Sequence, residues 1–372
     1  MEELHDITVS LITCSPGHEV WANYGHTALR VQYPEQGLDL TFNYGLFSFD
    51  TPHFIWRFCT GETDYCVGAF DTRNFLREYK LENRQVTEQV LDLPEQDKEN
   101  LWNALLVNCQ PENRYYRYNF FYDNCATRVR DMIVRNSSSE ISYNTPAPYG
   151  NLRDVLNFYT EDYSWTGFGI SMLLGSETDA PASLREQMFA PEIMQSAFAN
   201  ATVDGHSLVK ETNVLCSIEP SVPASHFKAP APYLVTMALF IAVLLLTGIG
   251  ARKSRRFWGV DIALNMLLGL MGCVIFFLAA FSSHPCTSPN WLLLFLNPLE
   301  LVYAVALCFP KWRNSNAALW CSALWLLPVV AAIVVLAIFN VQYMHIALLP
   351  LMLALIDRSV FSIISLGKSR KA

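Results

Sequence analysis

The pattern of apolar positions along the chain changes once, near residue 232. Before that point, short stretches alternate apolar with polar residues or repeat apolar residues at helical spacing, and after it long apolar stretches follow one another. Alternation predicts half-buried strands, helical spacing predicts amphipathic helices, and about 20 consecutive apolar residues predict a helix that crosses a bilayer. We therefore expect an α+β domain with an antiparallel sheet and helices, followed by an all-α transmembrane bundle.

Five strands and three helices are predicted in the first part. The strands are expected at residues 7–14, 26–33, 38–47, 65–70 and 86–91, and the helices at residues 72–82, 94–109 and 125–135. The second and third strands flank Pro34-Glu35-Gln36-Gly37, which predicts a hairpin with a four-residue loop. If this loop pairs Tyr33 with Leu38, Ala28 lies opposite Asn43.

The second part contains five apolar stretches, each close to the length that a transmembrane helix needs. They are residues 233–250, 258–281, 291–309, 317–339 and 345–366. Residues 219–232 are rich in proline and predict a linker. The expected organisation is an N-terminal domain at residues 1–218, this linker, and a transmembrane domain at residues 233–372.

Charge separates the same two parts and predicts their topology. Only three of the 34 acidic residues and ten of the 26 Lys and Arg residues follow residue 232, so the first part carries a net charge of −15 and the rest +7. The basic residues of the second part cluster in alternate connections and in the C-terminal tail, which the positive-inside rule places in the cytoplasm. The N-terminal domain is then outside the cytoplasm, and its negative charge makes nucleic acid an unsuitable partner.

Some polar and apolar positions have two interpretations. Glu300 lies within the third apolar stretch, where it is either a polar group near a substrate or a hydrogen-bonded acid that packs two helices. Asp357 and Arg358 interrupt the fifth stretch and are expected to form a local ion pair. The apolar residues 165–174 either line an acyl groove or pack in an ordinary core.

Cys125 is the first candidate for chemistry. It begins the predicted amphipathic helix at residues 125–135, and either Asp123 or Asn124 is suited to cap that helix. A thiol at a helix N-terminus has a lowered pKa, which favours the nucleophilic thiolate, and nearby backbone N–H groups can hold an oxyanion. The alternative is a buried structural cysteine or half of a disulfide.

His26 is the candidate base for this thiol, because it opens a predicted strand directly after a glycine. The expected hairpin register places Asn43 on the same face as His26, where it can fix the imidazole tautomer as the third member of a triad does. Other residues remain possible in these roles: Asp39 and Asp50 as the third group, and His18 and His53 as the base.

The ten cysteines leave further pairings open. Six of them precede residue 232, and an oxidising compartment could join some of these, with Cys59 and Cys66 the nearest pair in sequence. No Cys and His spacing resembles a zinc site, so we expect no metal, and no cofactor is expected.

Three motifs resemble the Lnb-type lipoprotein N-acyltransferases of Bacteroides and relatives. They are Tyr24-Gly25-His26-Thr27-Ala28-Leu29-Arg30-Val31, Phe42-Asn43-Tyr44-Gly45 and Phe121-Tyr122-Asp123-Asn124-Cys125-Ala126-Thr127-Arg128. The later Leu173-Leu174-Gly175-Ser176 and Phe189-Ala190-Pro191 and the five apolar stretches also fit this family. The order of histidine before cysteine is similar to that of permuted papain-like enzymes such as lecithin:retinol acyltransferase.

The resemblance implies a thiol acyltransferase in the bacterial inner membrane, with its N-terminal domain in the periplasm and its C-terminus in the cytoplasm. Cys125 would be the nucleophile, His26 the general base and Asn43 a possible orienter of His26, and we expect substrate contacts from the neighbouring Tyr122, Asn124 and Arg128. The implied partners are a phospholipid acyl donor, a diacylated lipoprotein acceptor and membrane lipids. The alternative is a membrane-anchored papain-like cysteine hydrolase or peptidase that acts on periplasmic peptides.

Overall fold

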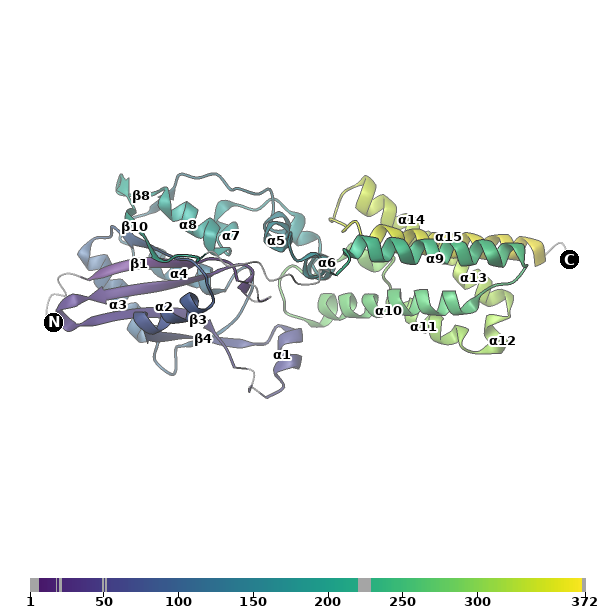
Figure 1. Ribbon diagram of the computed structural model, residues 1–372, viewed down its shortest axis with the longest axis horizontal. Coiled ribbons are helices and arrows are strands. Elements are labelled where there is room, and N and C mark those ends of the chain that lie inside the picture. The colour runs from purple at the N-terminus through teal and green to yellow at the C-terminus, as the bar shows by residue number, and fades with distance from the viewer. Residues whose placement is uncertain are drawn as a thin grey trace. The chain divides into compact units, whose positions relative to one another are not determined.

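The computed structural model describes residues 7–17, 19, 22–48, 50, 52–219 and 229–369 (Figure 1). The predicted linker at residues 219–232 therefore lies largely outside the described residues. The described chain divides into two compact units. The N-terminal unit contains the described parts of Met1–Tyr159, Pro181–Ser225 and Ser283–Pro285, and the helical unit contains those of Thr160–Ala180, His226–Ser282 and Cys286–Ala372.

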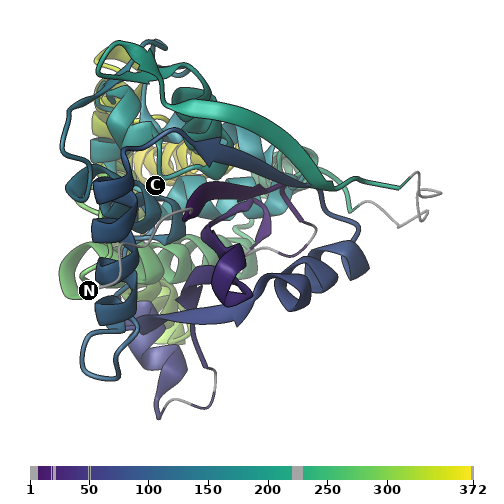
Figure 2. The same ribbon diagram turned by 90° about the vertical axis from the view of Figure 1, so that its left-hand side faces the viewer.

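The N-terminal unit is built on an antiparallel sheet that, in the described residues, has seven strands. Their spatial order is β10 (Val209–Cys216), β5 (Val86–Leu91), β1 (Thr8–Cys14), β2 (His26–Tyr33), β3 (Leu38–Leu46), β4 (Asp64–Asp71) and β6 (Tyr115–Arg117). Figure 2 shows β10 along one edge of this sheet, beside β5. The five predicted strands are confirmed, and β6 and β10 are additional.

The register of the β2–β3 hairpin is also confirmed. Tyr33 pairs with Leu38 across a short 3₁₀ turn (η2, Pro34–Gln36), and Ala28 pairs with Asn43. Gly37 closes the turn in the left-handed conformation, with φ 65° and ψ 23°, which glycine adopts without steric cost. The hairpin thus places Asn43 on the sheet face that carries Ala28 and His26.

Helices cover both faces of this sheet. On one face, Leu11 and Leu29 belong to a buried cluster with α3 (Glu95–Asn108), α4 (Cys125–Arg135) and α8 (Pro191–Ala199). On the other, Ile12 and Ala28 pack with α2 (Thr72–Leu81). The centre of the sheet is therefore buried on both sides. This packing holds in place strands β2 and β3, which carry His26 and Asn43. The three predicted helices correspond to α2, α3 and α4.

The remaining elements of the N-terminal unit are short. A second sheet, three-stranded within the described chain, has the order β7 (Ile141–Tyr143), β8 (Ala201–Val203) and β9 (His206–Ser207). Three further helices are α1 (Phe54–Thr60), α5 (Leu152–Thr160) and α7 (Leu184–Gln187). Helix α1 exposes Ile55 and Trp56 at 78 % and 61 %, and its C-terminal carbonyl at Thr60 accepts hydrogen bonds from Ser283.

In the helical unit, four described helices or helix runs are long and apolar enough to cross a membrane. These are Pro232–Arg252, Trp258–Phe281, Asn316–Ile338 and Leu348–Leu366. The third predicted stretch is shorter, at Trp291–Leu307. The elements of this unit are α6 (Ser164–Leu173), η3 (Ser176–Asp179), α9 (Pro232–Arg252), α10 (Trp258–Phe281), η4 (Trp291–Leu294), α11 (Pro298–Leu307), α12 (Pro310–Arg313), α13 (Asn316–Leu324), α14 (Leu326–Ala332), η5 (Ile333–Ile338) and α15 (Leu348–Ser369).

The apolar residues 165–174 lie in the helical unit, mostly in α6. Phe168 belongs to a buried cluster with residues of α10, η4 and α15. The carbonyls that end α6 accept hydrogen bonds from Asn290 and Gln342, in the two connections that contain no Lys or Arg. Core packing is thus the observed role of Phe168, while Trp165 stays 44 % exposed.

The local ion pair expected between Asp357 and Arg358 is wrong. Arg358 instead donates two hydrogen bonds to Asp261 on α10, at 3.0 and 2.8 Å, and Asp357 accepts one from Thr247 on α9 at 2.6 Å. Arg256 also pairs with Asp261 at 2.7 Å. The negative charge of a buried carboxylate is better compensated by two guanidinium groups than by one. This buried network also joins helices that are distant in sequence.

Helices α10 and α11 pack closely because α10 presents glycines to its neighbour. A Cβ added at Gly269 would overlap the backbone nitrogen of Leu301, and one added at Gly272 would lie 2.5 Å from the carbonyl oxygen of Leu296. Small residues allow helix backbones to approach in this way. Glu300, on α11, is fully buried beside this contact, and its carboxyl oxygens have no hydrogen-bond partner within the described structure.

This contact predicts different effects for two Gly→Ala substitutions on one helix. Gly269→Ala should lower the melting temperature of the full-length protein in detergent, because overpacking costs about 1–3 kcal/mol. Gly259→Ala should leave it unchanged or raise it, because nothing lies within 4 Å of its added Cβ and alanine favours helix. Equal melting temperatures for the two variants would contradict this account of the α10–α11 contact.

Candidate active site

Cys125 is the first residue of α4, and its position is fixed by the cap of that helix. Asn124 is the N-cap: its side-chain oxygen accepts hydrogen bonds from the backbone N–H groups of Ala126 and Thr127, both at 2.9 Å. The Thr127 hydroxyl oxygen in turn accepts a hydrogen bond from the Asn124 backbone N–H, which completes a capping box. The predicted start of the helix at Cys125 is confirmed. Of the two residues that could cap it, Asn124 is the cap and Asp123 is not.

His26 is the first residue of β2, and its imidazole forms a hydrogen bond with the Cys125 thiol. Two glycines permit this approach. Gly25 has φ 80°, and a Cβ there would lie 2.7 Å from the carbonyl oxygen of Cys14. Gly45 has φ 96°, and its added Cβ would lie 3.9 Å from the Cys125 Cβ and 4.0 Å from His26 Cε1. Both glycines have a positive φ, and at Gly25 there is also no room for a Cβ, whereas a Cβ at Gly45 would make only ordinary van der Waals contacts.

Asn43 holds the other side of the imidazole. His26 Nε2 lies 2.6 Å from Asn43 Oδ1, so Nε2–H donates to the amide oxygen and Nδ1 is the ring nitrogen left for the thiol. The structure therefore brings Cys125, His26 and Asn43 together, from a helix and two strands separated in sequence. Their roles in a reaction remain predictions.

The electrostatics of this triad favour a charged sulfur. Burial raises the pKa of the Cys125 thiol, but the His26 charge, its hydrogen bond, and backbone hydrogen bonds from Thr27 and Ala126 outweigh burial and lower that pKa. Burial also lowers the pKa of His26, whereas the Cys125 charge and hydrogen bonds to Cys125 and Asn43 raise it overall. A thiolate and an imidazolium stabilise each other, and the thiolate is the reactive form of cysteine.

A cleft of about 460 Å³ opens beside His26. Tyr79 lies against it, with its ring stacked on the imidazole at a centroid distance of 6.5 Å and an interplanar angle of 16°. Charged side chains also line it, among them that of Arg84. The lining residues are Gly17, Glu19, Ala22, Gly25, His26, Asn43, Tyr44, Gly45, Leu46, Glu78, Tyr79, Glu82 and Arg84.

The residues expected to contact substrate have other partners as well. The Asn124 side-chain nitrogen donates to the carbonyls of Phe120 and Phe189, at 3.0 and 2.8 Å. Arg128 makes a two-point ion pair with Asp123 and lies over the Tyr116 ring at 4.0 Å. Tyr122 is half exposed. These contacts give Asn124 and Arg128 structural roles, and substrate binding by all three residues stays a prediction.

The alternative triad members lie elsewhere. Asp39 forms an ion pair with Arg30 at 2.6 Å, and His53 caps α1 in a left-handed conformation. Neither Asp50 nor His53 lines the cleft beside His26, and His18 lies outside the described residues.

The cysteines are all free thiols, and all ten lie in the described part of the chain, so the suggested Cys59–Cys66 disulfide is not formed. Among the described residues, no group of three or more His, Cys, Asp or Glu side chains is placed to hold a metal ion.

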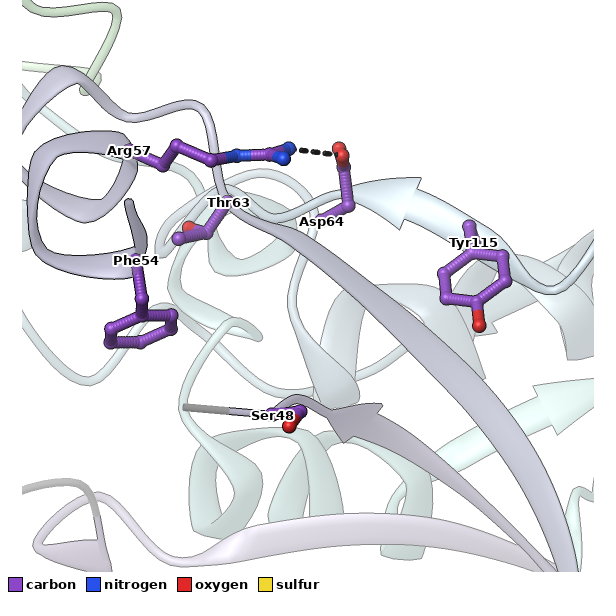
Figure 3. A pocket seen from close by; sticks show the side chains of 6 residues that line it. All are labelled: Ser48, Phe54, Arg57, Thr63, Asp64 and Tyr115. Atoms are coloured by element: carbon purple, nitrogen blue, oxygen red, sulfur yellow. Dashed lines mark hydrogen bonds and ion pairs between the residues drawn. The ribbon is translucent and has the colours of Figure 1, made fainter. Parts of the chain in front are cut away.

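A second pocket, of about 200 Å³, lies between α1 and β4 (Figure 3). Its polar groups are paired with each other: Arg57 donates to Asp64 at 2.5 Å. Arg117 donates to the same carboxylate at 2.9 Å. None of the described residues that line this pocket is a cysteine or a histidine, in contrast to the cleft beside His26, which is the candidate active site.

Gly45 belongs to the motif Phe42-Asn43-Tyr44-Gly45 that the sequence indicated, whereas no motif indicated Tyr79 or Arg84. Tyr79 and Arg84 come from α2 and the turn before β5, and only the packing of α2 on the sheet brings them to His26.

The fold and the site define a class of protein in which an α+β domain carries a thiol–imidazole pair and precedes apolar helices. Comparison with family models refines this class. Residues 3–157 match the Lnb N-terminal periplasmic domain and residues 224–370 match the Lnb transmembrane domain. No curated protein and no solved structure matches the chain significantly.

The chain therefore belongs to the Lnb family. It is a membrane protein of lipoprotein processing, with a periplasmic N-terminal domain and a C-terminal transmembrane domain. The expected family and the α+β-then-helical fold class are both confirmed.

The lowered pKa of Cys125 predicts the pH dependence of its alkylation. The rate at Cys125, measured by mass spectrometry with iodoacetamide, should rise with pH at a midpoint below the ordinary cysteine range. His26→Ala should move that midpoint upward, because burial then acts without the opposing imidazolium. His53→Asn should leave the midpoint unchanged, because His53 does not line the cleft. Asparagine is a suitable replacement because it tolerates the positive φ at this position. A midpoint insensitive to His26→Ala would argue against the pair.

The Asn43 contact predicts opposite shifts for two substitutions. Asn43→Ala removes a hydrogen bond that raises the His26 pKa, so the alkaline limit of activity should move to lower pH and activity should fall by at least roughly tenfold. Asn43→Asp adds a negative charge beside the imidazolium, so the same limit should move to higher pH. Shifts in the same direction for both variants would show that Asn43 does not act through His26.

Proposed function

We propose that this protein is a lipoprotein N-acyltransferase that works through a thioester on Cys125. It would move an acyl chain from a phospholipid to the α-amino group of the diacylglyceryl-cysteine of a bacterial lipoprotein. The observation that carries the proposal is the hydrogen-bonded Cys125–His26 pair, with Asn43 on the far side of the ring. Of these three residues, His26 and Asn43 line the cleft.

In the first half-reaction, the Cys125 thiolate attacks an ester carbonyl carbon of the phospholipid. The carbonyl oxygen becomes an oxyanion, and it forms at the N-terminal end of α4, where the helix dipole favours negative charge. As the intermediate collapses, the C–O bond breaks and the His26 imidazolium donates its proton to the departing alkoxide. A lysophospholipid leaves, and the acyl chain remains on sulfur as a thioester.

In the second half-reaction, the α-amine of the lipoprotein cysteine attacks the thioester carbonyl. Neutral His26 accepts a proton from the attacking nitrogen, and the C–S bond breaks to restore the thiolate and an imidazolium. An amide replaces the thioester. Thioesters react readily with amines, so transfer competes well with hydrolysis where water is kept out.

The membrane location supports lipid substrates. The family places this domain in the periplasm on a transmembrane domain, next to the bilayer that contains phospholipids and lipid-modified proteins. The exposed Ile55 and Trp56 on α1 give the periplasmic domain an apolar surface of the kind that enters lipid interfaces.

The proposal predicts an acyl-enzyme on one residue. Full-length protein incubated with phospholipid and no acceptor should gain the mass of one acyl chain on Cys125, release lysophospholipid and lose the adduct in hydroxylamine. Cys125→Ala should abolish both products, whereas Cys66→Ala, a change at another partly buried free cysteine, should retain them.

Addition of a diacylated lipopeptide then distinguishes transfer from hydrolysis. N-acylation of the lipopeptide with loss of the enzyme adduct supports the acyltransferase. Cleavage of periplasmic peptides with no lysophospholipid would instead indicate the hydrolase or peptidase. An adduct that persists in Cys125→Ala would refute the assignment of the nucleophile.

A further inference from the structure

One buried cation at the candidate active site has an unused donor. Arg84 is 8 % exposed, and its guanidinium group has three partners within the protein. Nε donates to the Ser15 carbonyl at 2.9 Å, Nη1 donates to Glu82 at 2.9 Å, and the guanidinium lies 4.7 Å from the centroid of the Tyr79 ring. Nη2 has no hydrogen-bond partner among the residues that the structure describes.

An unsatisfied buried guanidinium nitrogen is costly, so its presence calls for a partner that the protein itself does not supply. Arg84 cannot turn away easily, because it is held at both Nε and Nη1. Gly17 also confines it: a Cβ there would lie 3.2 Å from Arg84 Cδ and Nε. The side chain is thus held in place in the wall of the cleft, with Nη2 buried and without a hydrogen-bond partner among the described residues.

The position of Arg84 connects Nη2 to the reaction site. Arg84 lines the same cleft as His26. Tyr79 contacts both groups, since its ring lies under the guanidinium and stacks on the imidazole. A ligand at Nη2 therefore lies within a short span of the Cys125–His26 pair.

We propose that Arg84 Nη2 binds the phosphodiester of the acyl donor. Guanidinium groups bind phosphate oxygens with short, charge-assisted hydrogen bonds. In a glycerophospholipid only the glycerol carbons separate the phosphate from the acyl esters, so holding the phosphate at Arg84 brings an ester carbonyl towards the sulfur. This inference rests on the proposed function and names the part of the donor that the cleft recognises.

The rest of the cleft selects among phosphodiesters. Glu19 and Glu78 also line it, and their negative charge would repel a headgroup whose only charge is the phosphate. A headgroup that carries an ammonium beyond the phosphate places its positive charge among these acids. The ligand that fits is accordingly a zwitterionic phosphodiester.

The test compares two acyl donors on the full-length protein in detergent micelles. Phosphatidylethanolamine contains the phosphodiester, and p-nitrophenyl palmitate offers an activated acyl ester without one. Arg84→Ala and Arg84→Lys should lower kcat/KM for acylation of Cys125 by phosphatidylethanolamine about 10- to 100-fold. Arg84→Lys keeps the positive charge that acts on His26 and should acylate with p-nitrophenyl palmitate at near the unsubstituted rate, which also shows that this variant is folded.

A matched control and two further measurements complete the test. Arg77→Ala removes an exposed arginine of α2 outside the cleft and should change neither rate. Transfer from preformed acyl-enzyme to a diacylated lipopeptide should be unaffected by Arg84→Lys, because the acceptor has no phosphate. The unsubstituted protein should use phosphatidylethanolamine faster than phosphatidylglycerol.

The outcomes separate the inference from the proposed function. Equal losses on both donors, or no loss on phosphatidylethanolamine, would overturn the assignment of Arg84. Equal use of the two phospholipids would overturn the zwitterionic preference. Failure of the unsubstituted protein to form an acyl-enzyme with either ester would instead refute the proposed function.

Discussion

The hydrogen bond between the Cys125 thiol and the His26 imidazole is the contact on which the functional account depends. Neither group is favourable alone in this position, since burial opposes charge on each. Together they form a pair in which each charge stabilises the other. The cap at Asn124, the hairpin register that places Asn43, and the positive-φ backbone at Gly25 and Gly45 position the residues that make this one contact.

The site lies at the junction of locally determined elements. The start of α4 is set by its own cap, and the β2–β3 hairpin is set by its four-residue loop and by alternation of apolar residues. For this reason the sequence could predict the position of Cys125 on its helix and the register that places Asn43 beside His26. Local rules were sufficient wherever the interacting residues belonged to one helix or one hairpin.

Contacts between distant elements could not be predicted in the same way. Arg358 pairs with Asp261 on another helix rather than with its neighbour Asp357. Strand β10 joins the sheet edge beside β5 only after several helices intervene, and Arg84 reaches the cleft through the packing of Tyr79 and Ser15. Each of these depends on which elements become neighbours in the fold, and periodicity along the chain carries no information about that choice.

The state of the sulfur gives the most direct test of this account. The ultraviolet thiolate absorbance of the unsubstituted protein, minus that of Cys125→Ala, reports ionisation of this one thiol as pH is varied. The account predicts that the signal appears at a lower pH than the ordinary cysteine range, because the His26 charge and hydrogen bonds lower the pKa of this thiol. A signal that first appears at or above that range would show that Cys125 is an ordinary buried thiol, and would contradict the ion pair.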